Sequence, residues 1–163
     1  MEIRAKTYEY ISSSDNYDFS SLASDAVILV NAAMADTKFI RLPEGTTSNG
    51  GMHIRVIFGI PPSGKCFVGF VTSKIVGGAT SISDANGGNC STNPAYKTCA
   101  SGDAILRVEL KKGEDARAGG LAGTILDFHY TGTASLVLYR GNLIGEVDTP
   151  TLGSHFSTTA INA

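Results

Sequence analysis

Apolar and polar residues alternate along short stretches of the chain, and these stretches are separated by Gly, Asn, Asp, Ser and Pro. This spacing is typical of strands rather than helices. The segment 104–112 (AILRVELKK) shows the alternation, and so does MHIRVIF, where Met52, Ile54, Val56 and Phe58 fall on one face and His53, Arg55 and Ile57 on the other. Such a pattern predicts half-buried strands with one face toward a core and one face toward solvent.

The same patterning predicts about ten strands and very little helix. We expect strands at 3–11, 26–32, 38–42, 52–60, 65–76, 79–83, 104–112, 124–130, 135–141 and 143–147. Two short segments, 19–26 and 113–122, are the best helical candidates, but the first is Ser-rich and Gly119-Gly120 interrupts the second. The sequence therefore predicts an all-β protein, an antiparallel two-sheet sandwich of jelly-roll type, with a small closed barrel as the alternative.

Length and composition agree with one domain over residues 1–163. Charged residues make up 17% of the chain, against about 25% in an average domain, which favours short polar connections over charged helix faces. The formal net charge is -2 and no basic cluster exceeds Lys111-Lys112, so we expect no nucleic-acid partner. Residues 1–20 contain a predicted strand followed by a Ser-rich stretch. Such a segment can extend as an arm that adds to the sheet of a neighbouring subunit.

Targeting and membrane signals are absent from the amino-acid pattern. The first residues carry Glu2, Arg4, Lys6 and Glu9 rather than a continuous apolar segment, so no secretory signal is expected. Runs such as AVILV are far shorter than the ~20 residues that a membrane-spanning helix needs. We therefore expect synthesis in a cytoplasm and no membrane association.

The segment 59–66 (GIPPSGKC) resembles a phosphate-binding loop in its letters, because Gly59, Gly64 and Lys65 match the pattern. Cys66, however, replaces the Ser or Thr whose hydroxyl binds magnesium, and two prolines remove backbone donors. The following residues also favour strand over the helix that a phosphate loop requires. We therefore predict a tight, solvent-facing turn at 61–64 that joins two antiparallel strands, with no helix at Lys65.

Other turns follow from their residue types. Arg140-Gly141-Asn142 joins two short strand candidates and is expected to form a tight hairpin. The polar segment 84–103 contains no convincing strand, and loops of that length are usually functional or disordered. We expect a recognition surface on this loop, with Tyr96 and Lys97 at its tip.

Cysteine spacing points neither to zinc nor to a secreted disulfide framework, since the three cysteines are Cys66, Cys90 and Cys99 with no CxxC pair. A disulfide between Cys90 and Cys99 would close a local loop. The sequence does not decide whether this disulfide forms, because reducing compartments keep most thiols reduced.

Catalytic chemistry has one weak candidate, an Asp127 and His129 pair on one strand face that would need a nucleophile such as Cys66. The histidines lack metal-binding spacing. We therefore expect no catalytic site, no metal and no cofactor, and a non-enzymatic protein.

The stretch SDAVILVNAAMADTKFIRLPEGTTSNGGMHIRVIF, about 35 of the 163 residues, resembles segments of bacteriophage virion proteins of the capsid decoration (cement) type. The resemblance rests on a strand ending in Leu-Pro, a small polar turn, and a Gly followed by an alternating strand. It implies a structural protein of the virion that binds the major capsid protein or other virion subunits, stabilises the shell and forms a homo-oligomer, with a trimer favoured. The alternative is a carbohydrate- or receptor-binding β-sandwich module of phage-tail or adhesin type.

Overall fold

The computed structural model describes residues 5–75, 107–111, 123–142, 156–157 and 160–161, and these residues contain strands and no helix. The strands are β1 (Lys6–Tyr10), β2 (Tyr17–Asp18), β3 (Ala26–Val30), β4 (Phe39–Arg41), β5 (His53–Phe58), β6 (Lys65–Gly69), β7 (Lys74–Ile75), β8 (Arg107–Lys111), β9 (Thr124–Tyr130), β10 (Ser135–Asn142) and β11 (Phe156–Ser157). The all-β prediction is confirmed, and the helical candidate at 19–26 is wrong, because its residues form turns, bends and the start of β3.

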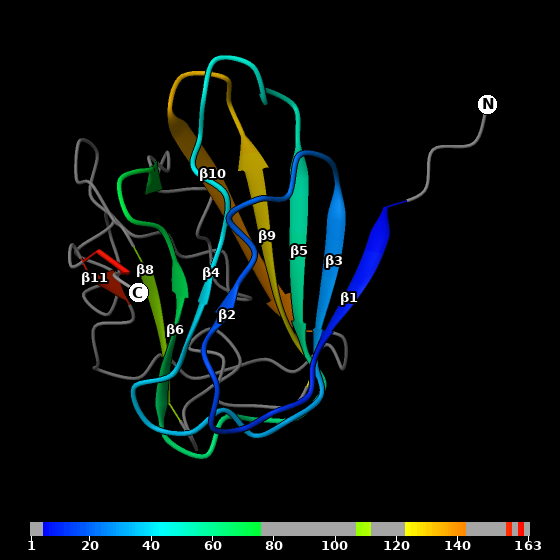
Figure 1. Ribbon diagram of the computed structural model, residues 1–163, viewed down its shortest axis with the longest axis vertical. Coiled ribbons are helices and arrows are strands. Elements are labelled where there is room, and N and C mark those ends of the chain that lie inside the picture. The colour runs from blue at the N-terminus through cyan, green and yellow to red at the C-terminus, as the bar shows by residue number, and fades with distance from the viewer. Residues whose placement is uncertain (1–4, 76–106, 112–122, 143–155, 158–159, 162–163) are drawn as a thin grey trace.

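Two sheets lie against each other (Figure 1). Sheet A has six strands in the order β1-β3-β5-β9-β10-β7, and sheet B has five in the order β11-β8-β6-β4-β2. The chain alternates between them, so β1, β3 and β5 belong to sheet A while β2, β4 and β6 belong to sheet B. Each turn of the chain therefore adds one strand to each sheet.

This alternation decides the strand direction. A chain that crosses to the opposite sheet and returns re-enters its first sheet in the same direction, so successive turns pair in parallel. Ala26 of β3 pairs with Lys6 on one side and with Ile54 on the other, both in parallel ladders. The β2–β4, β4–β6 and β7–β10 pairs are also parallel, whereas β5–β9, β9–β10, β6–β8 and β8–β11 are antiparallel.

The expectation of antiparallel sheets is thereby corrected, because both sheets are mixed. Strands of a jelly roll are paired antiparallel throughout, so the parallel pairs depart from that expectation as well. The extended arm expected within residues 1–20 is replaced over residues 6–10 and 17–18 by edge strands that pair with the chain's own β3 and β4.

The core lies between the sheets, where the apolar face of each alternating strand points inward. Ile54, Val56 and Phe58 of β5 are fully buried, and Phe128 of β9 meets Phe70, which follows β6, edge to face at 5.7 Å between ring centroids. Burying large aliphatic and aromatic side chains in this way is the main source of stability in such a fold.

The connections that cross from one sheet to the other, which we call arches, stack on one another. Backbone hydrogen bonds join neighbouring arches. The Asn31 amide donates to the Tyr10 carbonyl at 2.8 Å, and the Gly59 amide donates to the Val30 carbonyl at 3.0 Å. Side chains repeat the pattern, because the Asn16 side-chain oxygen accepts the Phe39 amide and the Asp36 carboxylate accepts the Lys65 amide, both at 3.0 Å.

The segment 59–66 is one of these arches. Its strand β6 begins at Lys65, so the prediction that no helix starts there is confirmed. The predicted hairpin is wrong, because β5 and β6 lie in different sheets and the turn crosses between them. Ser63 is exposed but Pro62 is buried, and the Ser63 amide donates to the Met34 carbonyl of the preceding arch at 2.9 Å.

The second predicted hairpin is also corrected. Arg140-Gly141-Asn142 continues strand β10, where Gly141 pairs with Ile125 and Asn142 pairs with Thr124 of β9. The tight connection of this region lies earlier, at residues 131–134 between β9 and β10, where Gly132 and Ala134 both have positive φ.

Candidate functional site

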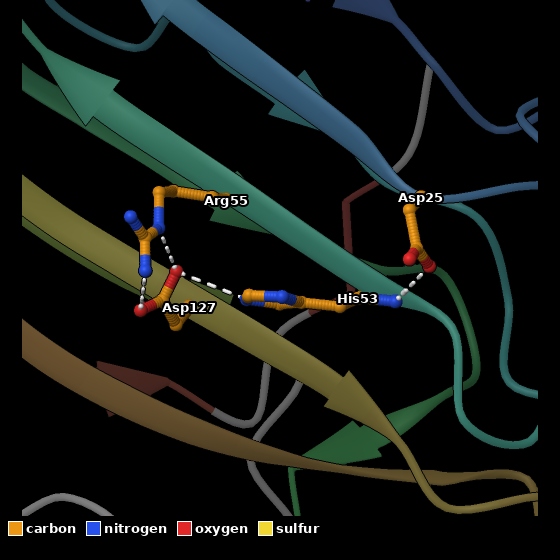
Figure 2. A network of polar contacts seen from close by, with 4 residues as sticks. All are labelled: Asp25, His53, Arg55 and Asp127. Atoms are coloured by element: carbon orange, nitrogen blue, oxygen red, sulfur yellow. Dashed lines mark hydrogen bonds and ion pairs between the residues drawn. The ribbon is translucent and has the colours of Figure 1, made fainter. Parts of the chain in front are cut away.

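Four polar residues meet on the outer face of sheet A, and we call Asp25, His53, Arg55 and Asp127 the polar cluster (Figure 2). Alternation along β5 explains their position. Ile54 and Val56 point into the core, so His53 and Arg55 point outward. Arg55 lies directly opposite Asp127 in the antiparallel β5–β9 ladder. Asp25 immediately precedes β3, beside the start of β5.

Asp127 is the centre of the polar cluster. Its Oδ1 accepts from Arg55 Nε at 2.7 Å and its Oδ2 accepts from Arg55 Nη2 at 3.1 Å, a two-point contact. His53 Nε2 lies 3.1 Å from the same Oδ1. The Asp127 side chain is only 17% exposed, against 42% for Arg55, so the carboxylate is shielded by its partners. The hydrogen bond that Arg55 donates to Asp127 raises the pKa of Arg55 above its usual value.

A second imidazole belongs to the same surface. His129 pairs with His53 across the ladder, and the rings stack with centroids 4.2 Å apart and planes 20° from parallel. The pKa of His129 is lowered by burial and by the neighbouring His53, with Asp127 acting in the opposite direction. Asp127, which the sequence pairs with His129, also contacts Arg55 and His53, and it acts electrostatically on His129.

Sequence reasoning missed Arg55 and His53 as partners of Asp127. The alternation placed His53 and Arg55 on one face and Asp127 with His129 on another strand, but the pairing of β5 with β9 joins segments about 70 positions apart. Only that pairing brings the two faces together.

Cys66 does not belong to the polar cluster. It is fully buried in β6 of sheet B, and burial raises the pKa of its thiol to about 12. A thiol is a nucleophile as its thiolate, so a group that stays protonated inside a core is inert. The predicted interaction residues Tyr96 and Lys97, and the cysteines Cys90 and Cys99, lie outside the part of the chain that the structure describes.

Within the described residues, no group of three or more His, Cys, Asp or Glu side chains is placed to hold a metal ion. No helix among them is long and apolar enough to cross a membrane. On the outer face of sheet A, aliphatic side chains surround the polar cluster. Five of them are half-buried: Val27, Leu29, Ile57, Ile125 and Val137.

A cavity of about 330 Å³ opens beside the polar cluster, at the end of sheet A where β3 and β5 begin. Residues 23–25 form one side and residues 48–52 form the other. Asp25 belongs both to this cavity and to the polar cluster, because its Oδ1 accepts the His53 backbone amide at 2.8 Å.

The class that these observations define is an all-β protein built from two mixed sheets with a charged and aliphatic outer face. No protein-family model, curated protein or solved structure matches the chain.

Proposed function

We propose that this chain is a non-enzymatic structural protein of a virion, of the capsid decoration type, that binds shell subunits through the outer face of sheet A. The observation that carries the proposal is the composition of that face. Half-buried Leu29, Ile57 and Ile125 form one cross-strand row, and the polar cluster lies directly beside it.

Such a face has the features of a protein-binding surface. Interfaces combine apolar side chains with arginine and a hydrogen-bonded polar periphery. Ile11, which follows β1 at the edge of sheet A, is a further apolar side chain that is 67% exposed. The two-point contact with Asp127 holds the Arg55 guanidinium in place, which lowers the entropy cost of binding a partner.

The chemistry of the site supports binding over catalysis. His53 and Asp127 form a carboxylate–imidazole pair, but among the described residues no hydrogen bond joins His53 to a Ser, Thr or Cys side chain, and catalysis by such a pair needs a nucleophile in reach. Hydrogen bonding between arches supports a structural role, since it joins successive coils within residues 5–75.

The shell partner and the favoured trimer follow from the resemblance of residues 24–58 to decoration proteins. This segment forms β3, β4 and β5, and two of those strands carry the outer face. We therefore place the shell contact on β3, β5 and β9, and subunit contacts at the edge strands.

Sucrose-gradient sedimentation of lysates from cells that naturally express the gene tests this function. We expect the chain in the particle fractions, and light scattering of the purified chain should give the mass of a trimer. Ile57→Lys should abolish rebinding to stripped particles, whereas Ser21→Lys, at an exposed position outside both sheets, should rebind normally. A chain found only at the top of the gradient, as a monomer, contradicts the proposal.

A further inference from the structure

The cavity beside Asp25 has one wall that is fixed by its own hydrogen bonds. Asn49 ties the loop before β5 together, because its Oδ1 accepts the Thr46 amide at 2.8 Å and its Nδ2 donates to the Glu44 carbonyl at 2.9 Å. The Gly51 amide donates to the Tyr130 carbonyl at 2.8 Å. Gly50 packs on Gly132, where a Cβ would come within 2.9 Å of the Gly132 Cα. This wall is preformed.

Both sides of the cavity carry polar atoms that have no hydrogen-bond partner among the described residues. One carboxylate oxygen of Asp25 accepts the His53 backbone amide, and the other oxygen has no hydrogen bond among the described residues. The Ser24 hydroxyl and the Gly50 amide are likewise without a partner in the part of the chain that the structure covers. Met52 also lines the cavity, but it belongs to the core and has only 6% of its surface exposed.

These atoms define the chemistry of the ligand. The free Asp25 oxygen only accepts hydrogen bonds, the Gly50 amide only donates, and the Ser24 hydroxyl does both. An ammonium ion offers only donors and would leave the Gly50 amide unsatisfied. A sugar ring offers hydroxyls that both donate and accept, which matches this mixed set of atoms. At about 330 Å³ the cavity lies at the small end of ligand sites, the size of one ring rather than a chain.

We propose that this cavity binds one monosaccharide unit of a glycan, with ring hydroxyls on the free Asp25 oxygen, on Ser24 and on the Gly50 amide. The Asp25 carboxylate joins the site to the polar cluster through the His53 amide, so an occupied cavity adds a ligand to the same outer face. The saccharide site does not depend on the virion role, because it is a property of the isolated chain.

Titration of the ¹⁵N-labelled chain with methyl glycosides of glucose, galactose, mannose and N-acetylglucosamine, each to 50 mM, tests the site. At least one sugar should cause saturable amide shifts confined to residues 23–25 and 48–53. Asp25→Asn keeps an oxygen for the His53 amide but replaces the other oxygen with a donor, and it should weaken that sugar's affinity at least tenfold. Ser24→Ala, which leaves Asp25 untouched, should weaken it about threefold.

Asp36→Asn is the matched control, because Asp36 also accepts a backbone amide, that of Lys65, but lies in an arch that does not line the cavity. It should bind the sugar with unchanged affinity. The proposal is overturned if no glycoside causes saturable shifts, if the shifts lie outside the cavity, or if Asp25→Asn and Ser24→Ala bind as tightly as the unaltered chain. Loss of particle association with sugar binding intact would reject the virion role alone.

Discussion

His53 and His129 stack across strands β5 and β9 with ring centroids 4.2 Å apart, and the pKa of His129 is lowered by burial and by this neighbour. A positive charge on His129 is disfavoured mainly because burial removes it from water, and the neighbouring His53 adds to this effect. Asp127 offsets part of this effect, while Arg55 adds to it. His129 is therefore a group on the outer face whose protonation opposes folding.

Stability should fall as pH drops through the histidine range. The unfolded chain binds a proton at His129 near pH 6.5, whereas the folded chain binds it only at lower pH, so the unfolded state gains protons first. We expect the melting temperature to fall between pH 7.5 and 5.5, and His129→Gln to reduce that slope while changing little above pH 7.5. Parallel curves for the two proteins across this range would contradict the assignment.

Glu44→Gln should destabilise the fold by about 2 kcal/mol, the scale of hydrogen bonds to a charged group. The Glu44 carboxylate accepts the amides of Val71, Thr72 and Ser73 and the Thr72 hydroxyl, and so joins the end of sheet B to the loop before β5. Burial acts to raise the pKa of Glu44, but these hydrogen bonds together outweigh it and hold the pKa below its usual value.

Urea denaturation at pH 7 measures this loss, and Asp15→Asn serves as the control, because the exposed Asp15 side chain makes no hydrogen bond among the described residues. The control should stay within about 0.5 kcal/mol of the unaltered chain. Since the folded pKa of Glu44 is lowered, its contribution is complete above pH 4.5 and is lost as pH falls through the folded value. Equal stability of Glu44→Gln and Asp15→Asn would refute the role.

Gly64→Ala should destabilise the fold by about 1–3 kcal/mol, the cost of overpacking. A Cβ at Gly64 would lie 2.7 Å from the Asp36 backbone nitrogen and 2.8 Å from its Cα, and backbone atoms held in the neighbouring arch cannot move aside cheaply. At Gly59 the nearest atom is instead the Asn31 side-chain oxygen, at 2.8 Å, which can rotate away.

Gly59→Ala is therefore the matched control, and denaturant midpoints should rank it between the unaltered chain and Gly64→Ala. Both glycines belong to the segment that resembles a phosphate loop. A larger loss for Gly59→Ala than for Gly64→Ala would show that arch packing is not what selects glycine here.

Cys66 should resist thiol reagents in the folded protein. Full burial and a pKa raised to about 12 leave almost no thiolate at pH 8. In a Cys90→Ser, Cys99→Ser variant, where Cys66 is the single thiol, the colour reaction with a disulfide reagent should be absent until denaturant is added. Fast labelling of the native variant would restore Cys66 as a candidate nucleophile.

The alternation of residues located the strands well. His53–Phe58, Thr124–Tyr130 and Arg107–Lys111 all lie inside predicted segments, and the buried residues of the first, Ile54, Val56 and Phe58, are those that the pattern placed on one face. The long segment 65–76 was predicted as one strand but is two, since β6 belongs to sheet B and β7 to sheet A. The hydrophobic pattern does not show where the chain passes from one sheet to the other. Strands of both sheets turn an apolar face toward the same core, so the pattern is the same in either sheet.

The candidate site was predicted only in part. Asp127 and His129 were singled out together, but Arg55, the strongest partner of Asp127, entered the sequence reasoning only as an outward-facing residue. The cavity was not foreseen at all, because its walls, residues 23–25 and 48–52, read as separate polar turns.

By itself, the sequence determined that this protein is built of strands and which face of each strand is buried, because a period of two residues is a local property of the backbone. Only the tertiary structure decided that Pro61-Pro62 lies in an arch between sheets rather than in a hairpin, and that β1, β3 and β5 are parallel neighbours. Turn residues such as Pro, Ser and Gly reverse the chain equally well in both cases. The choice between them depends on which distant strand completes the core and accepts the backbone hydrogen bonds.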